Sequence, residues 1–113
     1  MTILEITAGE RAAWQRRTAR ELAVILEAHR DLPVIVWTVA AAGATLVGHV
    51  TTLVPGGRVR QVFDLWRAAL MLTEHYETTA GSTTYLHAAA NRRRVRVRLT
   101  ATVHGEQPNA VSR

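Results

Sequence analysis

The chain has 113 residues, no cysteine and no lysine, and its fourteen arginines against nine acidic residues give a formal net charge of +5. This length fits one domain with one modest hydrophobic core. The lack of cysteine excludes disulfides, thiolate metal sites and cysteine nucleophiles. The use of arginine alone fits selection for bidentate anion binding or, as we favour, a GC-rich genome.

The positive charge is concentrated toward the carboxyl end. The arginines between residues 92 and 98 equal the whole net charge of +5, so the rest of the chain is neutral. A local basic patch indicates one acidic partner, such as a phosphate backbone or an acidic protein.

The amino-terminal residues 1–7 lack the basic region, apolar run and cleavage site of a signal peptide, so we expect a cytoplasmic protein. Residues 32–57 contain no Asp, Glu, Lys or Arg and are long enough to span a bilayer. Prolines, glycines and a histidine interrupt this segment, however. We therefore expect a β-hairpin there and no membrane partner.

The first half of the chain predicts a helix followed by that hairpin. Residues 2–6 suit a short edge strand or a frayed end, and Thr7-Ala-Gly-Glu10 has the spacing of a capping box. Apolar residues at three- and four-residue steps then predict a helix from about Ala8 to His29. It ends before Pro33, because the residue preceding a proline avoids the α region.

Two runs rich in β-branched residues, Val34–Val39 and Thr45–Leu53, predict the strands of the hairpin. A four-residue loop at 41–44 places Trp37 opposite Gly48, which leaves room for the indole. The other face of this hairpin is too apolar to be left wholly in water.

The second half repeats the order helix, strand, strand. A helix is predicted from about Val59 to Tyr76, with an apolar surface wide enough for deep burial or for pairing with another subunit. Residues 77–82 are predicted as a loop and 83–89 as the third strand. The fourth strand is predicted over 94–104 because apolar and polar residues alternate there.

The register of the second hairpin decides which residues share its polar face. A two-residue turn at Asn91 and Arg92 puts Leu86 in the core with the valines of the last strand. It also places Tyr85 and His87 opposite Arg98 and Arg96.

These elements predict a two-layer α+β sandwich in the order αββαββ. Its sheet is four-stranded and mainly antiparallel, with both helices on one face. We expect a single domain over residues 1–105 and a disordered carboxyl-terminal tail over 106–113.

Three segments carry a resemblance: Leu32-Pro-Val-Ile-Val-Trp-Thr-Val39, Gly43-Ala-Thr-Leu-Val-Gly-His-Val50 and Leu99-Thr-Ala-Thr-Val103. With them the chain resembles small actinobacterial proteins of the streptomycete type that share this twice-repeated layout. The resemblance implies a bacterial cytoplasmic setting. It implies no activity, cofactor or site residue.

No catalytic or cofactor signature is present. The five histidines have no partner at a recognised metal-ligand spacing, and neither serine lies in a nucleophile elbow. We therefore expect no enzyme activity, no cofactor and no metal. An enzyme with a pocket between helices and sheet is the least favoured interpretation.

The favoured interpretation is a non-enzymatic, homodimeric binding module whose arginine-rich hairpin contacts an acidic partner, with nucleic acid preferred. Guanidiniums clamp phosphates and aromatic rings stack on bases. The candidate residues are Arg92, Arg93, Arg94, Arg96, Arg98, Tyr85 and His87. The opposing interpretation is that these arginines only keep the strand soluble.

The alternative function is a protein-interaction or assembly subunit that uses the apolar sheet face and the second helix. The candidate residues for self-association are Val34, Val36, Val47, Leu53, Leu65 and Leu72. Salt distinguishes the two functions, since phosphate contacts weaken steeply as salt rises whereas apolar association does not.

Overall fold

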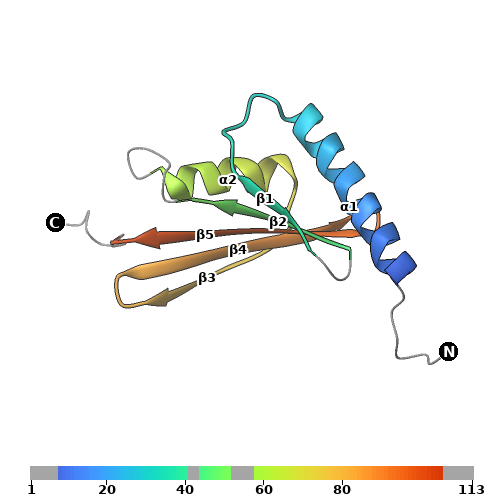
Figure 1. The fold of residues 1–113 in the computed structure, drawn as a ribbon. Coiled ribbons are helices and arrows are strands. Elements are labelled where there is room, and N and C mark those ends of the chain that lie inside the picture. The colour runs from blue at the N-terminus through green and yellow to red at the C-terminus, as the bar shows by residue number, and fades with distance from the viewer. Residues whose placement is uncertain (1–7, 41–43, 52–57, 106–113) are drawn as a thin grey trace.

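A computed structural model describes residues 8–40, 44–51 and 58–105. Along this part of the chain, helices and strands follow in the order αββαβββ (Figure 1). The elements are α1 (Ala8–Ala28), β1 (Val36–Val39), β2 (Thr45–Val50), α2 (Val59–Ala69), β3 (Glu74–Ala80), β4 (Thr83–Arg92) and β5 (Val95–His104). The predicted edge strand, the capping residue Thr7, Leu53 and the predicted tail lie outside the described residues.

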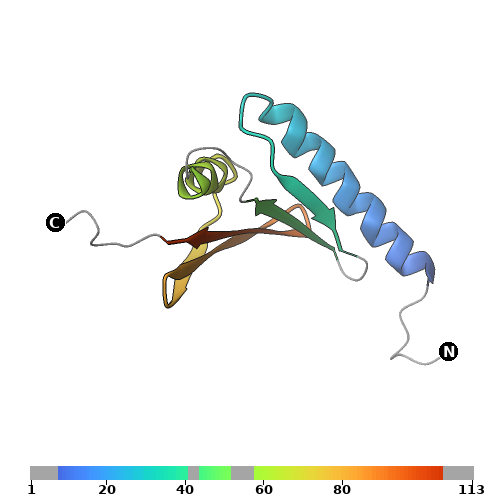
Figure 2. The ribbon, with the colours of Figure 1, turned by 60° about the vertical axis from the view of Figure 1, so that its left-hand side comes forward.

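The strands form one open sheet in the order β1-β2-β5-β4-β3. Strands β2 and β5 are parallel, and every other pair is antiparallel. Both helices lie on the same side of the sheet (Figures 1 and 2). The mixed α+β class is confirmed, but the sheet has five strands where four were predicted.

The side that carries the helices, called the covered face, holds a single apolar core. Ile25 of α1 and Phe63 and Trp66 of α2 pack there against alternate residues of β2, β4 and β5. The predicted pairing of Trp37 with Gly48 is confirmed. A Cβ at Gly48 would lie 2.7 Å from Cζ3 of Trp37, so the glycine makes room for the indole.

The second helix is shorter than predicted. It ends at Ala69 instead of Tyr76, because Met71 takes a left-handed conformation with φ of 52°. The amide of Met71 donates to the carbonyl of Ala68 at 3.1 Å, and that of Leu72 to the carbonyl of Arg67 at 3.1 Å. These two bonds form a Schellman motif, which terminates a helix.

The residues after this motif correct two further predictions. Residues 74–80, assigned to the end of the helix and to a loop, form β3 and pair with β4 along its length. A two-residue turn at Gly81 and Ser82 joins the two strands, and Gly81 has a φ of 63°. The hairpin β3–β4 therefore adds an edge strand to the sheet.

The turn between β4 and β5 has the predicted length but lies two residues later, at Arg93 and Arg94. Both have positive φ, as a type I′ hairpin turn requires. Tyr85 consequently lies opposite Thr102, and His87 opposite Thr100, instead of opposite the arginines. The later turn extends the ladder and so pairs more backbone groups. The parity is as predicted, with Leu86 and Ala88 in the core.

The hairpin predicted within residues 32–57 is confirmed, and its strands are β1 and β2. No helix among the described residues is long and apolar enough to cross a bilayer.

Candidate binding face

The side of the sheet opposite the helices, called the open face, carries the polar residues of the strands. Side chains alternate along β5, so Val95, Val97 and Leu99 are buried on the covered face. Arg96, Arg98, Thr100 and Thr102 project on the other side. Neither described helix packs against that side (Figure 2).

A row of polar and aromatic side chains crosses four strands of the open face. The register places His49 of β2 beside Thr100 of β5, then His87 of β4, then Tyr76 of β3. His49 Nδ1 lies 2.8 Å from Thr100 Oγ1, within hydrogen-bonding distance. The rings of Tyr76 and His87 are stacked, with centroids 4.6 Å apart and an interplanar angle of 13°.

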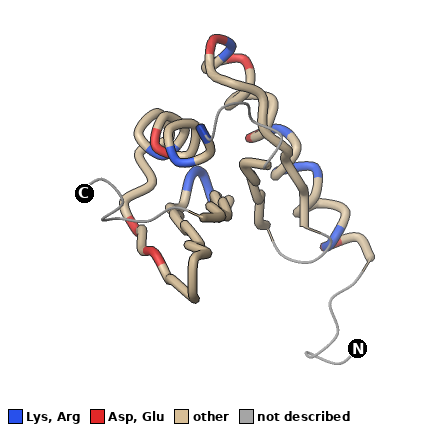
Figure 3. The backbone as a smooth tube through the Cα atoms, turned by 90° about the vertical axis from the view of Figure 1, so that its left-hand side faces the viewer, with Lys and Arg blue, Asp and Glu red and all other residues tan. Residues whose placement is uncertain are grey.

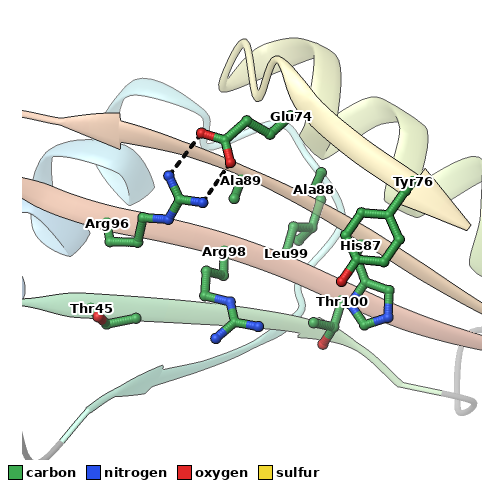
Figure 4. Close-up of a pocket in the computed structure, with 10 residues that line it drawn as sticks. All are labelled: Thr45, Glu74, Tyr76, His87, Ala88, Ala89, Arg96, Arg98, Leu99 and Thr100. Atoms are coloured by element: carbon green, nitrogen blue, oxygen red, sulfur yellow. Dashed lines mark hydrogen bonds and ion pairs between the residues drawn. The ribbon is translucent and has the colours of Figure 1, made fainter.

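A second row, two residues away along each strand on the same face, carries the charged side chains. Arg98 lies beside Ala89, and Ala89 beside Glu74. Because Ala89 is small, Arg96 reaches across β4 and forms a bidentate ion pair with Glu74, with N to O distances of 2.6 and 2.9 Å (Figure 4). The hydrogen bond from Arg96 holds the pKa of the Glu74 carboxyl below its ordinary value and raises the pKa of Arg96.

Between the two rows the open face is hollowed into a depression of about 250 Å³. Its lining includes Ala89, the stacked Tyr76 and His87, and the ion-paired Arg96 and Glu74 (Figure 4). Arg98 and the hydroxyls of Thr45 and Thr100 complete the polar part of this lining.

Arg98 differs from the other arginine at the depression. Figure 4 shows its side chain extending toward β2, away from Glu74. It makes no hydrogen bond or ion pair with any described residue. The nitrogen Nδ1 of His87 is buried and also lacks a hydrogen-bond partner among the described residues. The depression therefore offers one unpaired cation to a ligand.

The structure divides the arginines of the predicted site between the two faces. Arg92 is on the covered face, where its Nε lies 3.2 Å from a carboxylate oxygen of Glu21, a residue only 4 % exposed. Arg93, in the turn, lies 3.6 Å from the other oxygen of Glu21. Arg94 is exposed in the same turn and has no ion-pair partner in the described part of the chain. Ion pairs with Glu21 therefore hold the tip of the hairpin against α1.

Tyr85, His87, Arg96 and Arg98 are the predicted site residues that share the open face. The sequence prediction missed Glu74 and Tyr76 as site residues because it assigned both to a helix. The signal that could have placed them is the dipeptide Gly81-Ser82 between two threonine-rich runs, which is typical of a two-residue hairpin turn.

The described residues among those predicted for self-association do not form one surface. The prediction is wrong for Leu72, which is 1 % exposed and belongs to the core after the end of α2. Val34 is 93 % exposed, Val36 lies on the open face at the edge strand β1, and Leu65 is exposed on α2. Val47 is half-buried between Thr38 and Arg98.

Among the described residues, no three His, Asp or Glu side chains lie close enough together to hold a metal ion. Comparisons with models of known protein families, with curated proteins and with solved structures find no match. The residues of the open face therefore give the structural evidence for a function.

Proposed function

We propose that this protein is a non-enzymatic module of the bacterial cytoplasm that binds nucleic acid through its open face. The observation that carries the proposal is Arg98. It is a guanidinium without an ion-pair partner among the described residues, and it lines the same depression as the stacked Tyr76 and His87.

This combination suits nucleic acid because its two chemical parts need different partners. A guanidinium matches the oxygens of a phosphate, and an aromatic ring offers a stacking surface to a base. Here Arg98 comes from β5, His87 from β4 and Tyr76 from β3, three consecutive strands of the sheet, and the arginine stands one row from the two rings. The net charge of +5 and the basic positions along α1 (Figure 3) favour attraction of a polyanion.

The state of Glu74 supports a binding role over a catalytic one. A general base works best with a pKa near the working pH. The hydrogen bond from Arg96 lowers the pKa of Glu74, so this carboxylate is a weak proton acceptor at neutral pH. The pair shapes the wall of the depression.

Fluorescence anisotropy with labelled mixed-sequence oligonucleotides, at about 50 mM and about 200 mM salt, tests the proposal. We expect salt-sensitive binding by the wild type. Arg98→Ala should weaken it roughly fivefold to tenfold and reduce the slope of log affinity against log salt by about one.

Arg16→Ala is the matched control, because Arg16 is exposed on α1 and its loss changes the net charge equally. The control should lose much less affinity. Equal losses in the two variants would mean that net charge alone matters, and the open face would then be rejected as the site. No binding by the wild type at the lower salt concentration would reject the function.

The second candidate is a protein-interaction subunit, in the simplest case a homodimer. It is favoured by Val34, which is 93 % exposed, and by Val36, which is 51 % exposed on the edge strand β1. Burying such a patch stabilises association by roughly 25 cal/mol per Å². Under this candidate, light scattering gives a dimer mass that survives high salt, and Val34→Ser with Val36→Thr converts it to the monomer mass.

A further inference from the structure

We infer that the nucleic acid is single-stranded, and that the depression over Ala89 receives one nucleotide, with its base against Tyr76 and its phosphate at Arg98. This inference rests on the proposed function. It adds which form of nucleic acid is bound and which residues make a single strand bind more tightly than a duplex.

The ring of Tyr76 is available for stacking and held in place. Tyr76 is 59 % exposed, although one side of its ring is stacked on His87. The stack fixes the orientation of the tyrosine. The tyrosine side chain therefore loses little further freedom when a base packs against it. In a duplex the faces of the bases are covered by their neighbours. A ring placed in this way therefore selects unpaired bases.

The distribution of charge around the depression also favours a single strand. The bidentate contact with Glu74 occupies the guanidinium of Arg96, so at neutral pH the lining offers one unpaired cation, Arg98. One cation suits one phosphate of a single strand. A duplex instead presents two rows of phosphates to a broad basic surface. The tip arginines Arg92 and Arg93 would not extend such a surface, because they pair with Glu21.

The size of the depression fits part of a longer ligand. At about 250 Å³ the depression is smaller than the roughly 300–1,000 Å³ of pockets that enclose a whole drug-sized ligand. It suits one nucleotide of a longer ligand that continues over the sheet. Thr45 and Thr100 lie at its lining and can hydrogen-bond to the edge of a base.

The experiment compares one labelled strand, alone and annealed to its complement, in anisotropy titrations at fixed salt. We expect the single strand to bind at least tenfold more tightly, on the order of the stacking contribution that a duplex cannot make. Uridine- and thymidine-based strands are titrated in parallel to separate RNA from DNA, and either one meets the inference.

Tyr76→Ala should weaken single-strand binding roughly 5- to 150-fold, the range for loss of one stacked base. Tyr76→Phe keeps the ring and should stay within about twofold of the wild type. Tyr85→Ala is the matched control, since Tyr85 is 41 % exposed on the same face but does not line the depression. Its loss should be smaller than that of Tyr76→Ala. Thermal melts verify that each variant is folded.

Three results would overturn the inference while leaving the proposed function in place. The first is duplex binding as tight as single-strand binding, still dependent on Arg98. The second is a folded Tyr76→Ala variant with wild-type affinity. The third is inorganic phosphate competing as well as a nucleoside monophosphate, which would show an anion site that ignores the base. Failure of both nucleic acids to bind would overturn the inference and the proposed function together.

Discussion

Two carboxylates pair with different arginines of residues 92–98, and one of them is buried whereas the other is exposed. Glu21 reaches the tip of the β4–β5 hairpin from α1 and is 4 % exposed, with Arg92 and Arg93 around it. Glu74 projects from the edge strand β3 on the open face, where its side chain is 59 % exposed, and it holds Arg96. The first cluster joins a helix to the sheet, whereas the second shapes the edge of a depression.

The difference shows why a run of like charges is a poor guide to a binding site. Neighbouring arginines alternate between the faces of a strand or enter a turn, so each meets its own partner. Of the arginines in this run, Arg94 and Arg98 have no ion-pair partner in the described chain, and only Arg98 lines the depression. The basic patch of the sequence is therefore reduced to one available cation beside the aromatic stack.

The largest loss of stability is expected from a substitution in the apolar core of the covered face, on which both clusters depend. Leu46 of β2 is 0 % exposed in the core, and Leu46→Ala should lower the free energy of unfolding by about 2–5 kcal/mol. Urea denaturation measures this as a lower midpoint with an unchanged slope. Val47→Ala, one residue along on the open face, should cost far less. Equal losses would contradict the assignment of the two faces.

Breaking the Glu21 cluster should have the next largest effect. Glu21→Gln keeps the shape of the side chain but leaves Arg92 and Arg93 facing a neutral amide, which should cost about 1–3 kcal/mol of stability. Glu27→Gln is the control on the same helix. Glu27 pairs with Arg30 in solvent, with side chains 76 % and 74 % exposed, so we expect no measurable change in the denaturation midpoint.

The same variant tests whether the hairpin tip binds nucleic acid. Glu21→Gln releases two arginines at the hairpin tip, away from the depression. If the open face is the binding site, oligonucleotide affinity should stay near the wild-type value at temperatures where the variant is folded. A marked gain in affinity would return the site to the hairpin tip, as the sequence alone suggested.

The sequence predicted the parts of the fold that depend on local patterns. The helix before Pro33, the pairing of Trp37 with Gly48 and the alternation along β5 were all readable, because each follows from a local feature: a proline, the length of a loop or the spacing of apolar residues. The end of α2 was not readable, since Schellman motifs usually place glycine at the left-handed position and here it is Met71. Strand β3 is exposed along its whole length, so it carries no apolar alternation.

The candidate site was predictable to a smaller extent. His87, Arg96 and Arg98 were identified on the correct face because the parity of the turn was right. Tyr76 and Glu74 were missed, since they reach the site only through pairing of β3 with β4. The contact between Arg92 and Glu21 joins residues 71 positions apart, so no local pattern could show it.

The smallest effect on stability is expected from Glu74, yet it gives the clearest test of the open face. Glu74→Gln removes an exposed ion pair, so the denaturation midpoint should hardly move. The change releases Arg96 beside Arg98, however, and adds a second available cation at the depression. Oligonucleotide affinity should rise several-fold, and its salt slope should steepen by about one.

The pH dependence of this gain identifies its cause. Arg96 lowers the pKa of Glu74 below the ordinary 4.5, so wild-type Glu74 stays ionised above pH 4.5 and is neutralised only as the pH falls through the lowered pKa. The variant has no carboxylate at this position. The affinity ratio of variant to wild type should therefore be constant from about pH 5 to pH 8 and approach one in stronger acid. A ratio of one throughout would show that Glu74 does not restrain Arg96, and a ratio that stayed high in acid would assign the gain to another cause.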